Sequence, residues 1–245
     1  MANNLLLINN RDSTSYSSFR VTLNKFATAR KLSLKSFMFP NCTYSFNSYN
    51  NQFKVKKSGG SWVTVTIPKK IYNFSQLSSA IVTLLNAAAP TTTAFTCAYD
   101  TQTLLLTIGN DANFELDFNF DTSCYLQLGY AKTGTFASAT SYTGTMPLDL
   151  AGIKYITINL DIQGIGMINS NIASTRGQFL VPVDVSLGAY LYCNDEKYKQ
   201  SITLDNADIK TLNISIYDDN QNEIECLKEW SMILEVEEST AQSFV

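Results

Sequence analysis

Acidic residues are the side chains of this sequence whose types and spacing could most directly do chemistry. Glu115, Asp117 and Asp121 lie on one side of an expected strand, because they alternate with Phe and Leu. Carboxylates at i and i+2 on a strand lie about 6.5–7 Å apart at the backbone, and glycoside hydrolysis needs only two acids. Glu115 or Asp117 could therefore serve a glycosidase. The hydrated face of an amphipathic strand explains the same residues, and we prefer that interpretation.

A turn rich in Asp and Asn partly resembles a calcium-binding loop. Asp218, Asn220 and Asn222 have the spacing of its first ligands, and Glu229 falls at the twelfth position. The sixth position is Glu223, where such a loop needs glycine, and strands rather than helices are expected on both sides. A tight turn explains these residues more simply, so we predict no metal site.

Aromatic residues suggest a third kind of site. A sugar-binding groove could be lined by Tyr44, Phe46, Tyr49, Tyr125 and Tyr130. Tyrosine is also common in cores and subunit interfaces, where one end of the side chain is buried and the other is wet. We prefer the core or interface interpretation.

The sequence contains no histidine, the commonest general acid and base at neutral pH. Ser-His-Asp and Cys-His arrangements and a catalytic zinc with His ligands are therefore excluded. Neither phosphate-binding motif, G-x-x-x-x-G-K-[ST] or G-x-G-x-x-G, occurs. We expect a protein that is not an enzyme, with no catalytic, cofactor-binding or metal-binding residues and no cofactor.

Charge and cysteine content limit the partners and the compartment. The formal net charge of −3 argues against direct nucleic-acid binding. Solvated hairpin surface is expected for Lys54, Lys56, Lys57, Lys69 and Lys70. No apolar stretch approaches the roughly 20 residues that cross a membrane, and the first residues lack the pattern of a signal peptide. A reducing compartment and core thiols are expected from five cysteines without C-x-x-C spacing, Cys42, Cys97, Cys124, Cys193 and Cys226.

Alternating strand patterns fill both ends of the chain, after an N-terminal arm. They cover residues 19–23, 32–37, 156–162, 179–185, 202–204, 212–217 and 230–236. A total of about eight short strands is typical of a β-sandwich or jelly roll. Residues 164–177 lack periodicity and are expected to form a long loop, and 238–245 a tail. The prediction is a mainly β protein with one jelly-roll domain built from 1–51 plus 145–245.

The middle of the chain, 52–144, differs because it contains the one convincing helix. A hairpin is expected from strands at 53–57 and 62–68 with a turn at 58–61. The helix is capped by Asn73 or Ser75, and one face carries Leu77, Ile81, Leu84, Leu85 and Ala88. Strands follow at 95–99, 104–108 and 114–120, and then a loop at 131–145. We predict an inserted β-β-α-β-β-β subdomain, with two small tandem domains as the alternative layout.

The order of these segments resembles the penton, or vertex, minor capsid proteins of virophages and polinton-like viruses. The resemblance is carried by SFRVTL (18–23) with KLSLKSFMFP (31–40), by NQFKV (51–55), VTVTIP (63–68) and YNFSQL (72–77) before the helix, by CYLQLGY (124–130), and by LNISIYDDN (212–220) with EWSMILE (229–235). Each segment is short, and together they span most of the chain. The turn at 218–222 departs from the family pattern because it lacks a glycine.

The resemblance implies a structural virion protein, a single jelly roll that forms homopentamers at the fivefold vertices of an icosahedral capsid. The implied neighbours are hexamers of a double jelly-roll major capsid protein. The inserted subdomain would project outward, where it could contact a host surface. The implied location is the capsid vertex, after assembly in the host cytoplasm or a virus factory. No direct binding of nucleic acid or membrane is implied.

Alternatives remain open from the residues alone. A minor cement protein between capsomers would need the same jelly roll. A carbohydrate- or receptor-binding β-sandwich module is favoured by the aromatic residues, and the glycosidase by the paired acids.

Overall fold

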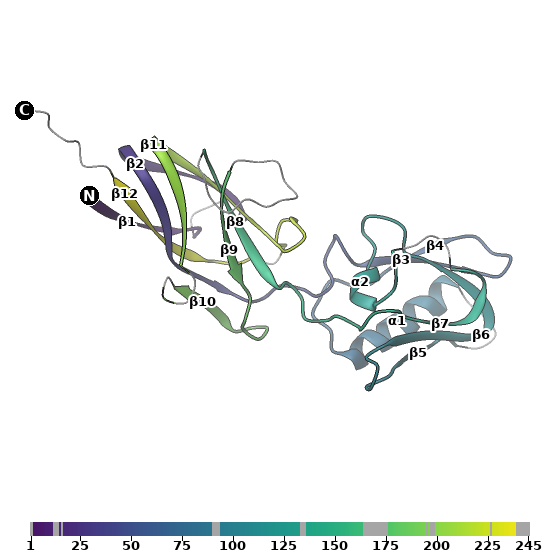
Figure 1. Ribbon diagram of the computed structural model, residues 1–245. Coiled ribbons are helices and arrows are strands. Elements are labelled where there is room, and N and C mark those ends of the chain that lie inside the picture. Colours follow the sequence, from purple (N-terminus) through teal and green to yellow (C-terminus); the bar gives the residue numbers. More distant parts are fainter. Residues whose placement is uncertain are drawn as a thin grey trace, which may run out of the picture. The chain divides into compact units, whose positions relative to one another are not determined.

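The computed structural model describes residues 2–11, 15, 17–89, 94–132, 136–163, 176–194, 196, 199–225 and 227–238. The chain divides into two compact units (Figure 1). The first consists of Met1–Thr43 and Ile153–Val245, and the second is the contiguous segment Tyr44–Gly152. The second unit thus interrupts the first in sequence.

The second unit begins earlier and ends later than the range 52–144 suggested by the sequence. Phe46 is fully buried in its core and forms a β-bridge with Lys70. At the other end, Leu148 and Leu150 pack against the same core. These residues lie in segments without strand periodicity, so only their packing reveals the unit to which they belong.

The first unit is built from antiparallel strands. In the described part of the chain they are β1 (Ala2–Asn9), β2 (Ser18–Pro40), β8 (Tyr155–Gln163), β9 (Arg176–Pro182), β10 (Tyr190–Asn194), β11 (Gln200–Tyr217) and β12 (Ser231–Glu238). The hydrogen-bonded order is β1-β12-β2-β11-β8-β9, and β10 pairs with β2 beyond the end of β11.

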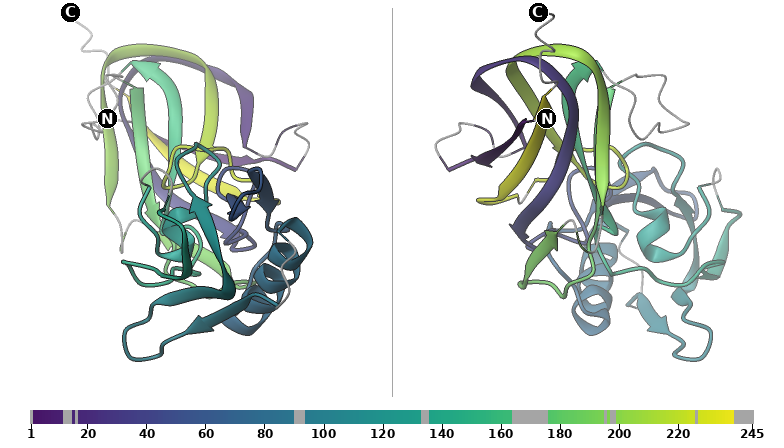
Figure 2. Two further views of the ribbon diagram at one scale, coloured as in Figure 1. Left: turned by 90° about the vertical axis from the view of Figure 1, so that its right-hand side faces the viewer. Right: turned by 60° about the vertical axis from the view of Figure 1, so that its left-hand side comes forward.

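The long strand β2 links two walls around one core. Its C-terminal part lies between β12 on one side and β10 and the first residues of β11 on the other, and its N-terminal part pairs with the later residues of β11. Figure 2 shows β2 and β11 as long, curved ribbons. The first wall is therefore β1-β12-β2-β10 and the second is β2-β11-β8-β9. Two four-stranded walls in this order are the arrangement of a jelly roll.

Continuous strands replace several of the short ones predicted. The segments 19–23 and 32–37 belong to the single strand β2, and 202–204 and 212–217 belong to β11. Register shifts interrupt the β11–β2 pairing between Thr203 and Thr211. Because such irregularities break the two-residue period, the sequence pattern is lost where the strand continues.

Two strands of the first unit were not predicted. The expected N-terminal arm contains β1, which pairs with β12 along its whole length. The short strand β10 lies after a segment rich in turn residues and pairs with β2. The expected loop 164–177 lies outside the described residues except for its last two, Arg176 and Gly177, which begin β9.

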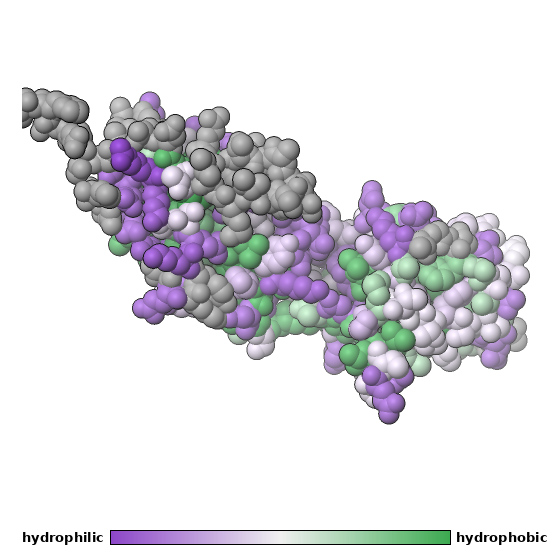
Figure 3. Space-filling view, in the orientation of Figure 1, coloured by the Kyte–Doolittle hydropathy of each residue, from purple (hydrophilic) through white to green (hydrophobic). Residues whose placement is uncertain are grey.

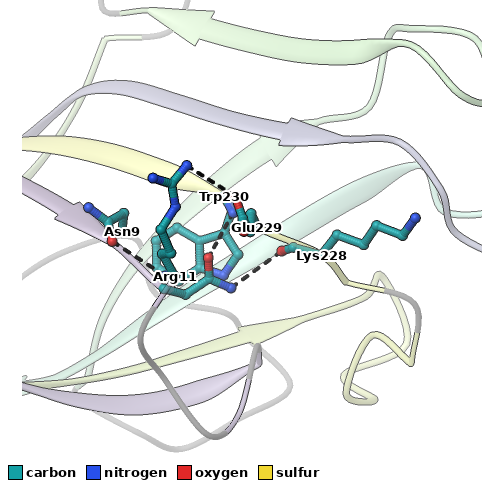
Figure 4. A network of polar contacts seen from close by, with 6 residues as sticks. Asn9, Arg11, Lys228, Glu229 and Trp230 are labelled. Atoms are coloured by element: carbon teal, nitrogen blue, oxygen red, sulfur yellow. Dashed lines mark hydrogen bonds and ion pairs between the residues drawn. The ribbon is translucent and has the colours of Figure 1, made fainter.

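Aromatic packing and a buried amide hold the start of β12 in place. Trp230 is 2% exposed, and its ring centroid lies 5.2 Å from that of Phe19 and 5.7 Å from that of Phe37. The backbone N–H of Trp230 donates to Oδ1 of buried Asn10 at 2.8 Å, and the Asn10 amide donates to the Lys228 carbonyl at 3.3 Å. Figure 4 shows the hydrogen bonds at Trp230 and Lys228, with the exposed ion pair of Arg11 and Glu229 beside them.

The second unit packs a helix against a sheet. Its described elements are β3 (Gln52–Lys57), β4 (Val63–Thr66), α1 (Phe74–Ala88), β5 (Thr96–Tyr99), β6 (Leu106–Asp117), α2 (Tyr125–Leu128) and β7 (Ala139–Thr143). The strand order is β4-β3-β6-β5, with β7 paired to β6. The helix buries Leu77, Ile81 and Leu85, as the sequence predicts.

The start of α1 follows from local chemistry. Asn73 is the N-cap, and its side chain accepts from the backbone N–H of Gln76 at 2.9 Å. The Gln76 side chain accepts in return from the Asn73 backbone, which completes a capping box. Of the two predicted caps, Asn73 is therefore the correct one.

The remaining elements of the second unit differ from the predicted β-β-α-β-β-β order. The segments 104–108 and 114–120 form one strand, β6, apart from their ends. The expected loop 131–145 contains β7, and the short helix α2 was not predicted. In β7 only Tyr142 is buried, among small side chains, so the sequence shows no alternation there.

Candidate interaction surface

Two of the three acids predicted on one strand face form ion pairs with the neighbouring strand, whereas the third, Asp121, lies in a turn beyond the end of β6. Nζ of Lys56 lies 2.8 Å from Oε2 of Glu115, and Nζ of Lys54 lies 3.8 Å from Oδ2 of Asp117. Asp121 is fully exposed and lies 3.7 Å from Lys132. Each of the three acids thus forms an ion pair with a lysine. The hydrated strand face is the interpretation that fits this geometry.

Removing these charges is expected to have a small effect. Glu115→Gln or Asp117→Asn should lower the free energy of unfolding by less than about 1 kcal/mol, because partly exposed ion pairs contribute little. Urea unfolding of each variant beside the unchanged protein measures this. A glycosidase would instead show Asp117→Asn losing a sugar-hydrolysing activity that the unchanged protein possesses, with assembly unaffected.

The turn at 218–222 uses its acidic side chain to close the chain reversal. Oδ1 of Asp218 accepts the backbone N–H groups of Asn220 at 2.9 Å and Asn222 at 2.8 Å. Burial raises the pKa of the Asp218 carboxyl, although these hydrogen bonds oppose the effect. Within the described residues, no three His, Cys, Asp or Glu side chains are grouped to hold a metal ion. The tight-turn interpretation accounts for these contacts.

The aromatic residues considered for a sugar groove are not grouped on the surface. Phe46 and Tyr130 are buried in the core of the second unit, whereas Tyr49 is 38% exposed. The Tyr130 ring stacks on Phe118 at 4.9 Å, and its hydroxyl donates to the Tyr142 carbonyl at 3.0 Å. Burial raises the pKa of the Tyr130 hydroxyl above its ordinary value. These two residues therefore stabilise the core.

Two of the described cysteines, Cys124 and Cys193, have buried side chains. Cys97 and Cys124 are free thiols. Burial raises the pKa of Cys97 to about 11 and also raises that of Cys124. Both thiols are therefore protonated at neutral pH and are poor nucleophiles. Cys226 lies outside the described residues.

The feature that sequence reasoning missed is an apolar strip on the outward side of the first wall, which we call the outer strip. Its exposed members, with their exposed fractions, are Leu5 (67%), Leu7 (71%), Met38 (40%), Tyr190 (65%) and Tyr192 (61%). Figure 3 shows hydrophobic residues among hydrophilic ones on the visible surface of both units.

Strand register brings the outer strip together. Leu7 lies opposite Ile233, which lies opposite Ser36. Two residues further along, Met38 lies between Ser231 and Tyr192. Directly opposed residues of an antiparallel sheet share a face, so the strip crosses all four strands, β1-β12-β2-β10.

The outward side of the second wall has a different character. Arg20 lies opposite Asn213, and Ser215 lies between Ser18 and Asn159. Asn159 is in turn opposite Gln178. Polar residues thus cover this side at positions where the first wall carries Leu, Met and Tyr.

Comparison with known proteins identifies the architecture. No family model matches the sequence, and no curated protein does. The crystal structure of the mavirus penton protein is similar, with a TM-score of 0.50 and 10% identity, covering 98% of this chain and 100% of that chain. The flagellar cap protein FliD of Escherichia coli (domains D1-D2-D3) gives a TM-score of 0.17 and 10% identity, covering 89% of this chain and 55% of that chain. The second value is too low to support any relationship.

The match to the penton protein confirms the predicted fold class and the predicted resemblance at the level of the fold. The chain is mainly β, with a jelly-roll β-sandwich and an inserted α+β part. Across the residues that the structure describes, no helix is long and apolar enough to cross a bilayer.

Proposed function

We propose that this chain is a structural capsid protein without catalytic activity, and that it forms homopentamers at the fivefold vertices of an icosahedral capsid. The observation that carries the proposal is the end-to-end similarity to a penton protein, which includes both the jelly roll and the inserted unit. A fold shared by many functions would be weak support. A jelly roll interrupted by a helix-bearing unit is a more specific architecture.

The surfaces of the first unit support a role in assembly. The outer strip exposes large apolar side chains across four strands, and large exposed apolar patches mark interaction sites on soluble proteins. Of the residues considered for a catalytic, metal or sugar site, Glu115 is engaged in an ion pair, Asp218 in turn closure and Tyr130 in core packing. The chemistry of this surface therefore favours contact between proteins.

The proposed neighbours are hexamers of a double jelly-roll major capsid protein, and the proposed location is the virion vertex. Residues 44–152 would then form the exposed part of the capsomer. Trp62, which is 37% exposed beneath Nζ of Lys56, is an aromatic side chain of this unit that a host-surface ligand could contact.

Native mass spectrometry of the purified chain tests the proposal. We expect a complex of five chains of 27.2 kDa each, with fivefold symmetry in electron micrographs. When the major capsid protein is co-expressed, the chain should occupy the vertices of the particles.

Other outcomes would point elsewhere. A stable monomer that also fails to join particles would overturn the proposal. Incorporation between hexamers rather than at vertices would identify a cement protein. A monomer that binds a glycan on an array, and loses that binding in Trp62→Ala, would identify a carbohydrate-binding module.

A further inference from the structure

One outer edge of the first unit is closed against further strands. Strand β9 ends the second wall. The Gln200 side chain accepts the backbone N–H of Leu180 at 2.7 Å and donates to the Leu180 carbonyl. Its amide therefore satisfies the same backbone groups that an added strand would use. Pro182, two residues further, has no N–H to offer. Such devices prevent uncontrolled pairing at a sheet edge.

The first wall differs in its end strands. In the hydrogen-bonded order of the described strands, β1 ends this wall on one side, and β10 pairs with β2 on the other. Neither Ala2–Asn9 nor Tyr190–Asn194 contains a charged residue or a proline. An exposed, uncharged edge beside an apolar face is an aggregation hazard unless another surface covers it.

The outer strip between these edges has the size and composition of an interface centre. Its five exposed side chains offer on the order of 500 Å² of apolar area, near the upper limit for a patch on a monomer. A stable protein interface buries about 800 Å² on each partner, so the strip with its surroundings is sufficient. Methionine and tyrosine are also enriched at the centres of protein interfaces. The ion pair of Lys35 and Glu235, 3.0 Å apart, lies at the Leu5 end of the strip, because Glu235 is paired directly with Leu5.

We propose that the outer strip is the surface through which each copy of this chain packs head-to-tail on the next copy. This inference rests on the proposed homopentamer and names the contact that would build it. A strip packed on an identical strip would give a closed twofold pair, whereas a ring needs two different surfaces on each copy. The strip is one of these surfaces, and the partner surface is elsewhere on the neighbouring copy.

The strip variant Leu7→Glu/Tyr192→Glu tests this inference. Both side chains are more than 60% exposed, so the isolated chain should fold normally, as circular dichroism would show. Assembly should require at least about 100-fold higher protein concentration, because each contact would bury unpaired carboxylates. The control Thr64→Glu/Ser79→Glu adds the same charge at exposed positions of the second unit and should assemble normally.

Mixing distinguishes head-to-tail packing from strip-to-strip packing. The strip variant keeps its second surface, so it should add to one end of a wild-type oligomer and stop further copies from adding there. When an equal mixture of wild type and strip variant is dissociated and reassociated, open oligomers with one variant copy at the end should form. Their masses would show that they contain both proteins. Exclusion of the variant from wild-type oligomers would overturn the head-to-tail contact.

The proposed function and the inference can fail separately. A pentameric wild type whose strip variant also remains pentameric would overturn the inference and leave the capsomer intact. A wild type that is monomeric at all concentrations would overturn both. Normal pentamers that no longer enter particles would assign the strip to the major capsid protein, and would also overturn the inference.

Discussion

Trp230→Ala should lower the free energy of unfolding of the first unit by about 3–5 kcal/mol, the range for removing a large buried aromatic side chain. Trp230 is almost fully buried, and its ring contacts both Phe19 and Phe37. These neighbours belong to different parts of β2, one on each wall. The cavity would therefore weaken the contact between the two walls, and the assembled form should be lost at physiological temperature.

Thermal and urea unfolding, followed by circular dichroism, measure this effect. The matched control is Trp62→Ala, because Trp62 is the other of the two tryptophans in the chain and is 37% exposed. Its removal should cost less than about 1 kcal/mol, the order of an exposed cation–π contact. Equal effects of the two substitutions would contradict the packing described for Trp230.

Gly129→Ala should destabilise the second unit by about 3–5 kcal/mol, from backbone strain and overpacking together. The φ angle of Gly129 is 75°, and an added Cβ would lie 2.0 Å from the carbonyl oxygen of Met146. That segment cannot move away freely, because the backbone N–H groups of Thr145 and Met146 both donate to the Gly129 carbonyl at 2.9 Å. The substitution must therefore break these hydrogen bonds or distort the end of α2.

Gly59→Ala separates the two causes. Gly59 has a similar φ of 72°, but no atom lies within 4 Å of the added Cβ. Only the left-handed backbone is penalised, at about 1–2 kcal/mol. Urea unfolding followed by the fluorescence of Trp62, the tryptophan of the second unit, compares the variants. If Gly129→Ala cost no more than Gly59→Ala, the close approach of Met146 would be wrong.

Elements that depend on local chemistry could be predicted from the sequence. The helix α1 is an example, because its cap Asn73 and its buried Leu77, Ile81 and Leu85 lie within one short segment. The alternation of Phe114, Leu116 and Phe118 with outward acids was equally clear. In both cases the residues that decide the structure are neighbours in sequence.

Elements that depend on distant partners could not be predicted. Strand β10 becomes a strand by pairing with β2, and β1 by pairing with β12, at opposite ends of the chain. The outer strip arises the same way, since Met38 and Tyr192 become neighbours only through that register. One signal was present, because Leu5, Leu6, Leu7 and Ile8 are all apolar. Such a run indicates a strand covered on both faces, but the sequence does not say by what.

The interruption of the first unit by the second also sets an order of events during synthesis. Residues 44–152 are contiguous and can fold as soon as they leave the ribosome. The jelly roll cannot fold until β11 and β12 have been synthesised, because β12 lies between β1 and β2, and β11 is the other neighbour of β2. Domains generally fold as units while the chain emerges, and contacts this distant in sequence form slowly. An unfinished chain would therefore display a folded second unit but no outer strip, so only complete chains would be competent to assemble.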